Sequence, residues 1–184
     1  MKRGLWIAAL ASMLLPLAAH AEIVKTATAD CKTGAICLHW WPKVVVPDGW
    51  RQAPGLSAEE NANFLVPEKA VDTRVFIYAN AADSHSQAGT RDGFIADDIA
   101  AFKKNNPGIV ITELAPMTTA DGQSLRVFRF DPGTSGRWEI AAYGDETDKD
   151  GNHYYLDFVL SGKTEALRDQ NLEVFRAVVA AYRQ

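Results

Sequence analysis

The sequence predicts an α+β fold in which two main helices, at about 90–105 and 164–183, pack on a mainly antiparallel sheet. Three strand-like segments joined by short turns lie near the C-terminus, at Ser124–Phe130, Trp138–Gly144 and His153–Leu160. Such a succession is typical of an antiparallel meander. Long strand-like runs with few helices indicate the α+β class.

The first third of the chain is expected to be extended and broken by turns. Glu22–Asp30 could form an arm or an edge strand. Two short strands, 35–41 and 43–46, are predicted on either side of a bend at Pro42, because proline cannot donate a hydrogen bond to a neighbouring strand. Pro47-Asp48-Gly49 predicts a tight turn, since proline presets its own φ and glycine accepts a positive φ.

The middle of the chain predicts a short helix and two strands. Ser57 and Glu60 have the spacing of a capping box, which predicts about one helical turn beginning at the serine. Asn63–Val66 has the pattern of a strand that ends at Pro67. Thr73–Ala79 is the most β-prone segment, and its apolar residues on both faces predict a central strand covered on both sides.

The first main helix is predicted from its spacing and its charges. Ile95, Ile99 and Phe102 lie four and three residues apart, which places them on one helical face. Asp92 in the first turn and Lys103-Lys104 in the last turn complement the helix dipole. A strand is expected to follow the helix at Ile109–Leu114.

The C-terminal helix is strongly amphipathic. Ser161 or Thr164 is expected to cap it, and Ser161-Gly162-Lys163-Thr164 lacks the first glycine of a phosphate-binding loop. One stripe of this helix is predicted to be buried against the meander. The stripe consists of Leu167, Val174, Phe175, Val178 and Tyr182.

The N-terminus has the pattern of a secretory signal peptide. Lys2 and Arg3 precede an apolar run at 5–17, and Ala19-His20-Ala21 provides a small-x-small cleavage site. A retained N-terminal anchor is the alternative. Cleavage after Ala21 would leave a single domain at 22–184 and would change the formal charge of the 184-residue chain from −4 to −6. We therefore expect a periplasmic or secreted protein, with no membrane insertion after cleavage and no nucleic-acid partner.

Cys31 and Cys37 are predicted to form a disulfide bond that staples the N-terminal segment. Two cysteines in an oxidising compartment usually pair, and Gly34 between them allows the chain to turn. A redox pair or a metal site with His39 is a weaker alternative, because the spacing is not C-x-x-C.

Several short segments between Lys43 and Gln184 suggest a family. They are Val44–Val46 running into Pro47-Asp48-Gly49-Trp50, the strand end Phe64–Pro67, the strand Thr73–Ala79, and the helix residues Phe175–Val179 with Tyr182. In this layout the chain resembles the PsbP-like family, which includes DcrB-like exported bacterial proteins. The resemblance implies an α+β fold and a binding or assembly role, mostly without catalysis. No site residue is implied.

An acidic segment has the register of an EF-hand calcium loop. Glu146, Asp148 and Asp150 fall at positions one, three and five, Gly151 at six and Asp157 at twelve. The pattern departs from the motif, since Glu and Asp are exchanged at its two ends and strands flank it. A weak Ca²⁺ site is one hypothesis, and a solvated hairpin turn is the other.

No catalytic set is predicted. Asp83, Ser84, His85 and Ser86 are adjacent in the sequence, and adjacent side chains rarely face one another as a triad requires. A loop with ordinary polar side chains is the simpler interpretation. His153 is a second candidate for a base.

Three tryptophans are candidates for a partner-binding surface. Trp40, Trp41 and Trp50 gather around Pro42 and Pro47. Aromatic rings beside a rigid turn can anchor a partner, although such rings more often belong to a core. Alternation along a strand predicts that Trp40 and Trp41 do not both face inward.

These observations favour an exported, non-catalytic binding or accessory protein that acts on a protein partner in the cell envelope. An assembly factor, an inhibitor or an immunity-type protein would fit. The alternatives are a small periplasmic hydrolase that uses His85 or His153, and an envelope accessory protein that binds Ca²⁺ weakly. No cofactor is implied other than this possible weak Ca²⁺.

Overall fold

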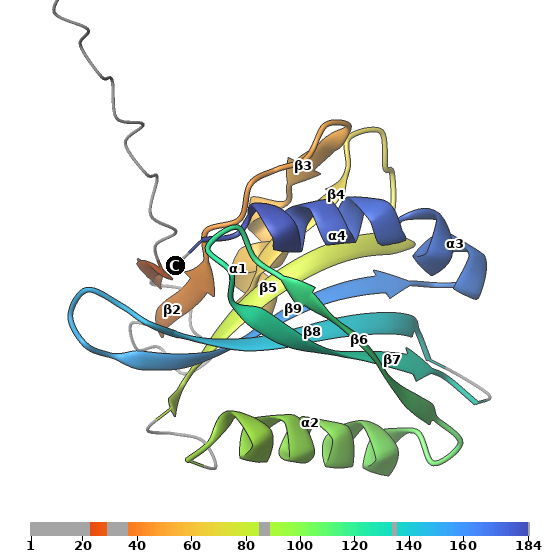
Figure 1. Ribbon diagram of the computed structural model, residues 1–184. Coiled ribbons are helices and arrows are strands. Elements are labelled where there is room, and N and C mark those ends of the chain that lie inside the picture. The colour runs from red at the N-terminus through yellow and green to blue at the C-terminus, as the bar shows by residue number, and fades with distance from the viewer. Residues whose placement is uncertain (1–22, 29–36, 85–88, 134–135, 184) are drawn as a thin grey trace, which may run out of the picture.

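The protein is an α+β domain built on a seven-stranded antiparallel sheet, with helices on both faces (Figure 1). The computed structural model describes residues 23–28, 37–84, 89–133 and 136–183. The sheet order is β3-β4-β5-β9-β8-β7-β6, and β1 pairs with β2 in a separate two-stranded sheet. The strands are β1 (Ile23–Thr28), β2 (Cys37–Pro42), β3 (Trp50–Gln52), β4 (Asn63–Pro67), β5 (Val75–Asp83), β6 (Val110–Thr118), β7 (Ser124–Asp131), β8 (Trp138–Thr147) and β9 (His153–Gly162).

The predicted meander is confirmed as β7, β8 and β9, each slightly longer than the sequence pattern indicated. β8 and β9 stay paired from Trp138↔Gly162 to Thr147↔His153, so the two strands form one long hairpin. β9 lies in the middle of the sheet, between β5 and β8.

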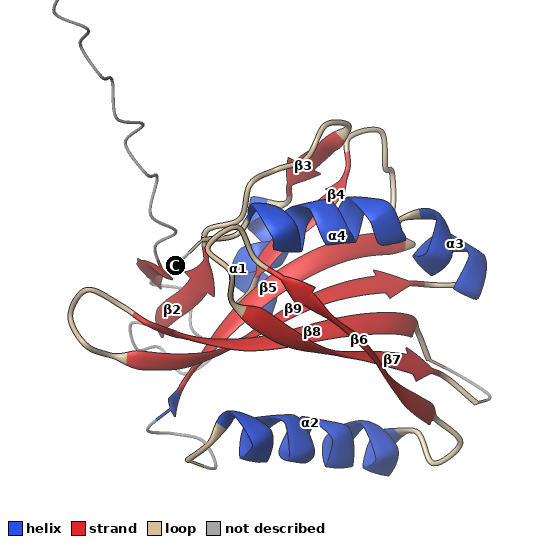
Figure 2. Ribbon diagram, in the orientation of Figure 1, coloured by secondary structure: helices blue, strands red, loops and turns tan. Residues whose placement is uncertain are grey.

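One face of the sheet is covered by α3 (Glu165–Gln170) and α4 (Leu172–Ala181) (Figures 1 and 2). The predicted stripe is confirmed, because Phe175, Val178 and Tyr182 are buried in the core with Leu167 and Val174 packed against them. The single predicted helix is instead two. Asn171 interrupts it because its side-chain amide donates to the carbonyl of Leu167 at 2.7 Å, which competes with regular helix bonding.

The opposite face carries α2 (Arg91–Asn105), which begins and ends close to the predicted residues. Thr90 caps it, since its hydroxyl accepts a hydrogen bond from the backbone N–H of Gly93 at 3.0 Å. Ile95 is buried and Phe102 lies 4.5 Å from Phe130 between ring centroids. α2 therefore packs mainly over β7 and β8 and leaves the β5 side of this face less covered.

Two local predictions in the first half of the chain are wrong. The short helix α1 (Pro54–Glu60) begins at Pro54, whose fixed φ suits the first helical position, and not at Ser57. The Ser57 hydroxyl instead accepts from the backbone N–H of Phe64 at 2.9 Å and ties α1 to β4. The predicted strand 43–46 is absent: these residues pair with no strand, and β3 is the neighbour of β4 at the sheet edge.

The predicted central strand is confirmed as β5, between β4 and β9. Its two faces differ, however. Val75, Ile77 and Ala79 are buried under α4, whereas Phe76 and Tyr78 are only half-buried on the α2 side. The expectation that both faces are covered is therefore only partly right.

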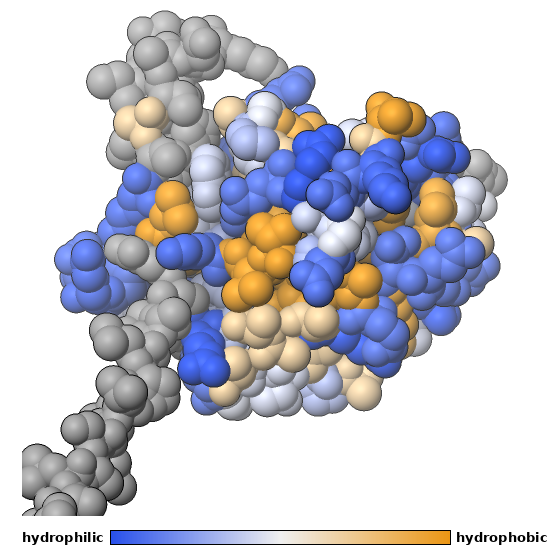
Figure 3. All heavy atoms as spheres, turned by 90° about the horizontal axis from the view of Figure 1, so that it is seen from above, coloured by the Kyte–Doolittle hydropathy of each residue, from blue (hydrophilic) through white to orange (hydrophobic). Residues whose placement is uncertain are grey.

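The predicted turn at Pro47-Asp48-Gly49 is confirmed, with a hydrogen bond from Trp50 N–H to the carbonyl of Pro47 at 3.1 Å and φ of +75° at Gly49. Within the described residues, no helix is long and apolar enough to cross a membrane. The surface on the α4 side is largely hydrophilic around a hydrophobic patch (Figure 3).

Candidate functional site

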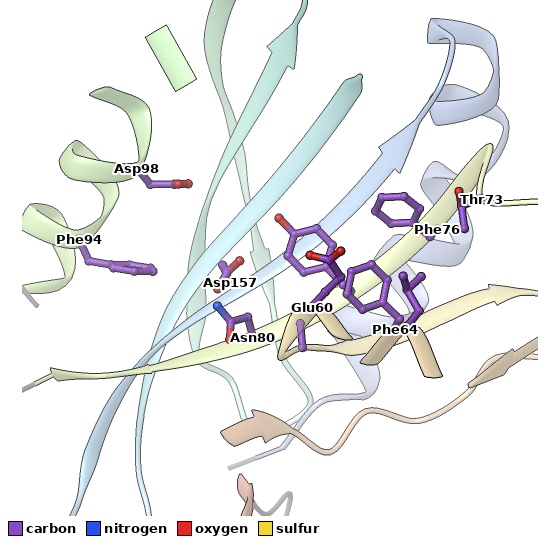
Figure 4. A pocket seen from close by; sticks show the side chains of 11 residues that line it. Glu60, Phe64, Thr73, Phe76, Asn80, Phe94, Asp98 and Asp157 are labelled. Carbon is purple, nitrogen blue, oxygen red and sulfur yellow. The ribbon is translucent and has the colours of Figure 1, made fainter. Parts of the chain in front are cut away.

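A cavity of about 620 Å³ lies between α1, α2 and the adjoining face of β4, β5 and β9 (Figure 4). This volume is within the range of sites that take a small organic ligand or a few side chains. Carboxylates and aromatic rings dominate its lining. They are Glu60, Asp98 and Asp157, and Phe64, Phe76, Tyr78 and Phe94.

Asp157 is the most unusual group in this cavity. It stands in the buried strand β9, where Leu156 and Phe158 point to the α4 core, so alternation directs Asp157 to the cavity face. Asp157 is only 8% exposed, and its Oδ1 atom has no hydrogen-bond partner in the described part of the chain. Asn80, its partner on β5, donates a side-chain hydrogen bond to the carboxylate.

Burial dominates the electrostatics of Asp157. Removal of the carboxylate from water, together with the nearby negative charge of Asp98, raises the pKa of Asp157 to about 7. The hydrogen bond from Asn80 opposes this rise but is the smaller effect. Asp157 therefore exchanges a proton near neutral pH.

Asp98 faces the same cavity from α2. The hydroxyl of Tyr143 on β8 donates a short hydrogen bond to Asp98 Oδ2. Burial raises the pKa of Asp98, and this hydrogen bond limits the rise. Burial of the phenol, and then the same carboxylate, raise the pKa of Tyr143 far above its ordinary value. Asp98 is thus an oriented carboxylate with a fixed partner.

Aromatic rings form the other wall. Phe64 stacks on Tyr78 with ring centroids 5.2 Å apart, and Phe76 lies 5.3 Å from Phe64. The guanidinium of Arg137 lies 4.4 Å from the centroid of Phe76, so this wall already makes one cation–π contact. The cavity joins this stacked aromatic wall to an acidic floor formed by Asp98 and Asp157, and none of the described residues that line it is Lys, Arg or His.

The structure does not bring together the four residues of the predicted calcium loop. Glu146 lies on β8 and accepts a short hydrogen bond from the Tyr182 hydroxyl in the α4 core, whereas Asp157 points to the cavity on the other face. Asp148 and Asp150 lie at the hairpin turn, where Asp148 accepts from the backbone N–H groups of Asp150 and Asn152 at 2.9 Å.

A cation already occupies the turn. Lys25 of β1 places its Nζ atom 2.7 Å from Asp148 and 3.4 Å from Asp150. The ion pair lowers the pKa of Asp148 and raises that of Lys25. A metal bound here would have to displace the lysine, and no cluster of three or more metal-ligating side chains occurs among the described residues. Calcium binding remains a prediction.

The three tryptophans do not form one surface. Trp50 is buried in the core beside α4, and Trp40 packs against that core while remaining half-buried. Trp41, the next residue on β2, is half-buried and pairs with Val24 across the β1–β2 hairpin. Binding of a partner by Trp40 and Trp41 remains a prediction, and the burial of Trp50 removes it from such a surface.

Other candidates from the sequence lie partly outside the described residues. Cys31, His85 and Ser86 are among these, and of Cys37 only the backbone is described, so the disulfide remains a prediction. His153 is described, and its Nε2 lies 3.3 Å from Asp145, whose carboxylate also accepts from Arg91 at 3.1 Å.

The cavity was not predictable from motif spacing, because the spacing of the acids assigned Asp157 to a calcium loop and gave Asp98 and Asn80 no role. One signal was present, because Asp157 is an acidic residue within the buried run Tyr154–Leu160. A charge in such a run must be paired or functional.

Comparison with known proteins does not place the chain in a family. No protein-family model matches the chain, and no curated protein matches it either.

Proposed function

We propose that the protein is an exported, non-catalytic binding protein of the cell envelope, which holds one side chain of a protein partner in the cavity between α1, α2 and the sheet. The observation that carries the proposal is the buried Oδ1 of Asp157 in the cavity floor, which has no hydrogen-bond partner among the residues that the structure describes. A buried acceptor without a hydrogen bond costs roughly 1–3 kcal/mol, and a bound donor would recover this free energy.

The signal-peptide pattern at 1–21 supports export to the periplasm or outside the cell. The antiparallel sheet with a C-terminal helix across one face supports the PsbP-like resemblance at the level of layout. An assembly factor, an inhibitor or an immunity-type protein would use a site of this kind to anchor its partner.

Site-specific photocrosslinking tests this function. Thr73 is exposed and lines the cavity, so a photoreactive amino acid at this position should form an adduct with a partner in a periplasmic extract. The matched control is the same amino acid at Ala180, which is exposed on α4. Excess unlabelled wild-type protein should abolish the Thr73 adduct, and the Asp157→Asn variant should compete poorly. Equal adducts at the two positions would contradict the proposal.

An acid–base hydrolase is the second candidate, and the carboxyl pair favours it. A group whose pKa is about 7, as for Asp157, can donate a proton at neutral pH, and Asp98 offers a second carboxylate in the same cavity. A panel of nitrophenyl glycosides and esters tests this function. Turnover that is lost in both Asp98→Asn and Asp157→Asn would favour the hydrolase over the binding protein.

A further inference from the structure

Among the described residues, the acidic side of the cavity leaves one hydrogen-bond acceptor of Asp157 unpaired. Within this part of the chain Asp157 Oδ1 has no hydrogen-bond partner, and strand alternation places the Asp157 side chain on the cavity face of β9. Asp98 approaches from α2 on the far side (Figure 4). One of its oxygens accepts a hydrogen bond from the Tyr143 hydroxyl. A ligand that satisfies this floor must donate hydrogen bonds.

The negative charge of the cavity determines the sign of the charge that a ligand must carry. Of the residues that the structure describes, Glu60, Asp98 and Asp157 are the carboxylates that line it, and no Lys, Arg or His does. Two carboxylates in a site shielded from water repel any anion and stabilise a cation strongly. An anionic or phosphorylated ligand is therefore excluded by the same interaction that favours a cation.

The aromatic wall favours a cation that is attached to an apolar group. Phe64 and Tyr78 stack at 5.2 Å and present apolar ring surface next to the acidic floor. Ring faces attract cations and bury apolar stems. The contact of Arg137 with Phe76 at 4.4 Å shows that the electrostatics of this wall already accommodate a positive charge.

We propose that the cavity binds a primary ammonium group at the end of an apolar stem, with the ammonium donating to the carboxylate of Asp157 and facing Asp98, and the stem lying against Phe64 and Tyr78. The lysine side chain of a protein partner and a free alkylamine share this chemistry. The inference rests on the proposed function and names the chemical class that its site recognises.

A primary ammonium fits better than the other organic cations. It has three donors on one small atom, whereas a quaternary ammonium has none and would leave Asp157 Oδ1 unpaired. A guanidinium has five donors in a flat fork and needs more acceptors than one free carboxylate oxygen and Asp98 supply. The order of affinity should therefore be primary ammonium, then guanidinium, then quaternary ammonium.

Binding should be linked to proton release. Asp157 must be ionised to hold the ammonium, and the amine itself stays protonated up to about pH 10. With a pKa of about 7 for Asp157, the ionised fraction of this carboxyl falls about 25-fold from pH 7.5 to pH 5.5, and the affinity should fall with it.

The ionisable groups around Asp157 are Asp98 on α2, Glu60 on α1, Glu139 and Tyr143 on β8, Tyr78 on β5 and the nearby Arg137.

Isothermal titration of the full mature chain tests the inference. The probes are hexylamine, an acetylated and amidated tripeptide with a central lysine, hexanol as the uncharged isostere, and tetramethylammonium. Hexylamine or the lysine peptide should bind at least about 10-fold more tightly than hexanol and tetramethylammonium. Asp157→Asn should lose at least about 10-fold in this affinity, while Asp97→Asn, an exposed neighbour on α2, should lose none. Circular dichroism verifies that both variants fold.

The outcomes separate this inference from the proposed function. Equal binding of hexanol and hexylamine, or an Asp157→Asn variant that binds hexylamine as the wild type does, would overturn the ammonium assignment. If a Thr73 adduct still forms in that case, a binding protein remains and only the ligand class is wrong. Tighter binding of the lysine peptide than of hexylamine assigns the ammonium to a protein partner. Tighter binding of hexylamine than of the lysine peptide assigns the ammonium to a free amine and overturns the proposal of a protein partner.

Discussion

Replacement of Asp157 by asparagine should stabilise the ligand-free protein at neutral and alkaline pH and leave its stability almost unchanged in acid. The substitution keeps the shape of the side chain and removes its charge. In the folded protein, burial and the charge of Asp98 raise the pKa of Asp157 to about 7. In the unfolded chain the same carboxyl ionises near its ordinary value of about 3.9.

The sign and the size of the effect follow from these two values. Between about pH 4 and pH 7 the folded protein holds a proton that the unfolded chain has released, so the stability of the wild type falls as the pH rises. Above pH 7 the loss is complete and amounts to about 4 kcal/mol at 1.4 kcal/mol per pH unit. This value is an upper limit for the gain in Asp157→Asn, because the new amide hydrogens also need acceptors.

Urea unfolding of the wild type and the variant at about pH 4, 6 and 8 measures the difference. Asp97→Asn is the matched control, since it removes the same charge from an exposed position on α2. The free energy of unfolding should be equal for all three proteins near pH 4, and Asp157→Asn alone should exceed the wild type by 2–4 kcal/mol at about pH 8. A variant less stable than the wild type at pH 8 would refute the assignment of Asp157 as a buried, uncompensated carboxylate.

Two further predictions concern the α3–α4 side of the sheet. Tyr182→Phe removes the hydroxyl that donates to the buried carboxylate of Glu146 and should lower the free energy of unfolding by about 1–3 kcal/mol at pH 8, whereas Glu146→Gln keeps an acceptor and should cost less. An unchanged urea midpoint in Tyr182→Phe would contradict this. Arg168→Met should cost about 3 kcal/mol in the same assay, because Arg168 is 2% exposed and its guanidinium lies 2.5 Å from Asp131, which would keep only its more exposed partner Arg129. Arg176→Met, at an exposed pair with Glu173 on α4, should cost less than about 0.5 kcal/mol, and equal losses in the two arginine variants would refute the distinction.

The sequence was sufficient to predict the two main helices and the meander because each has a clear period. Ile95, Ile99 and Phe102 repeat at helical spacing, and Leu156, Phe158 and Leu160 alternate along β9. The break at Asn171 was not predicted, because the hydrophobic stripe continues through it and only the side-chain hydrogen bond to Leu167 reveals the interruption.

The site could not be predicted because it depends on strand register. Glu146 pairs with Tyr154 in the β8–β9 hairpin, and Tyr154 points to the α4 core. Asp157 lies three residues beyond Tyr154 and therefore points to the opposite face. Counting along the chain placed Glu146 and Asp157 in one calcium loop, but the hairpin separates them across the sheet. Asp157 meets Asp98 only because α2 packs on that second face.

The unequal covering of the two sheet faces explains how a cavity with a buried acid can persist in a stable domain. On the α4 side, apolar residues of β4, β5, β7, β8 and β9 form one buried cluster with Phe175, Val178 and Val179. On the other side, α2 lies over β7 and β8 and leaves Tyr78 and Asp157 beside an unfilled space. The free energy lost by ionising Asp157 there, about 4 kcal/mol, is recovered only when a cation enters. A bound ammonium should therefore raise the melting temperature more at pH 8 than at pH 6, because the carboxylate that it pairs with is fully ionised only at the higher pH.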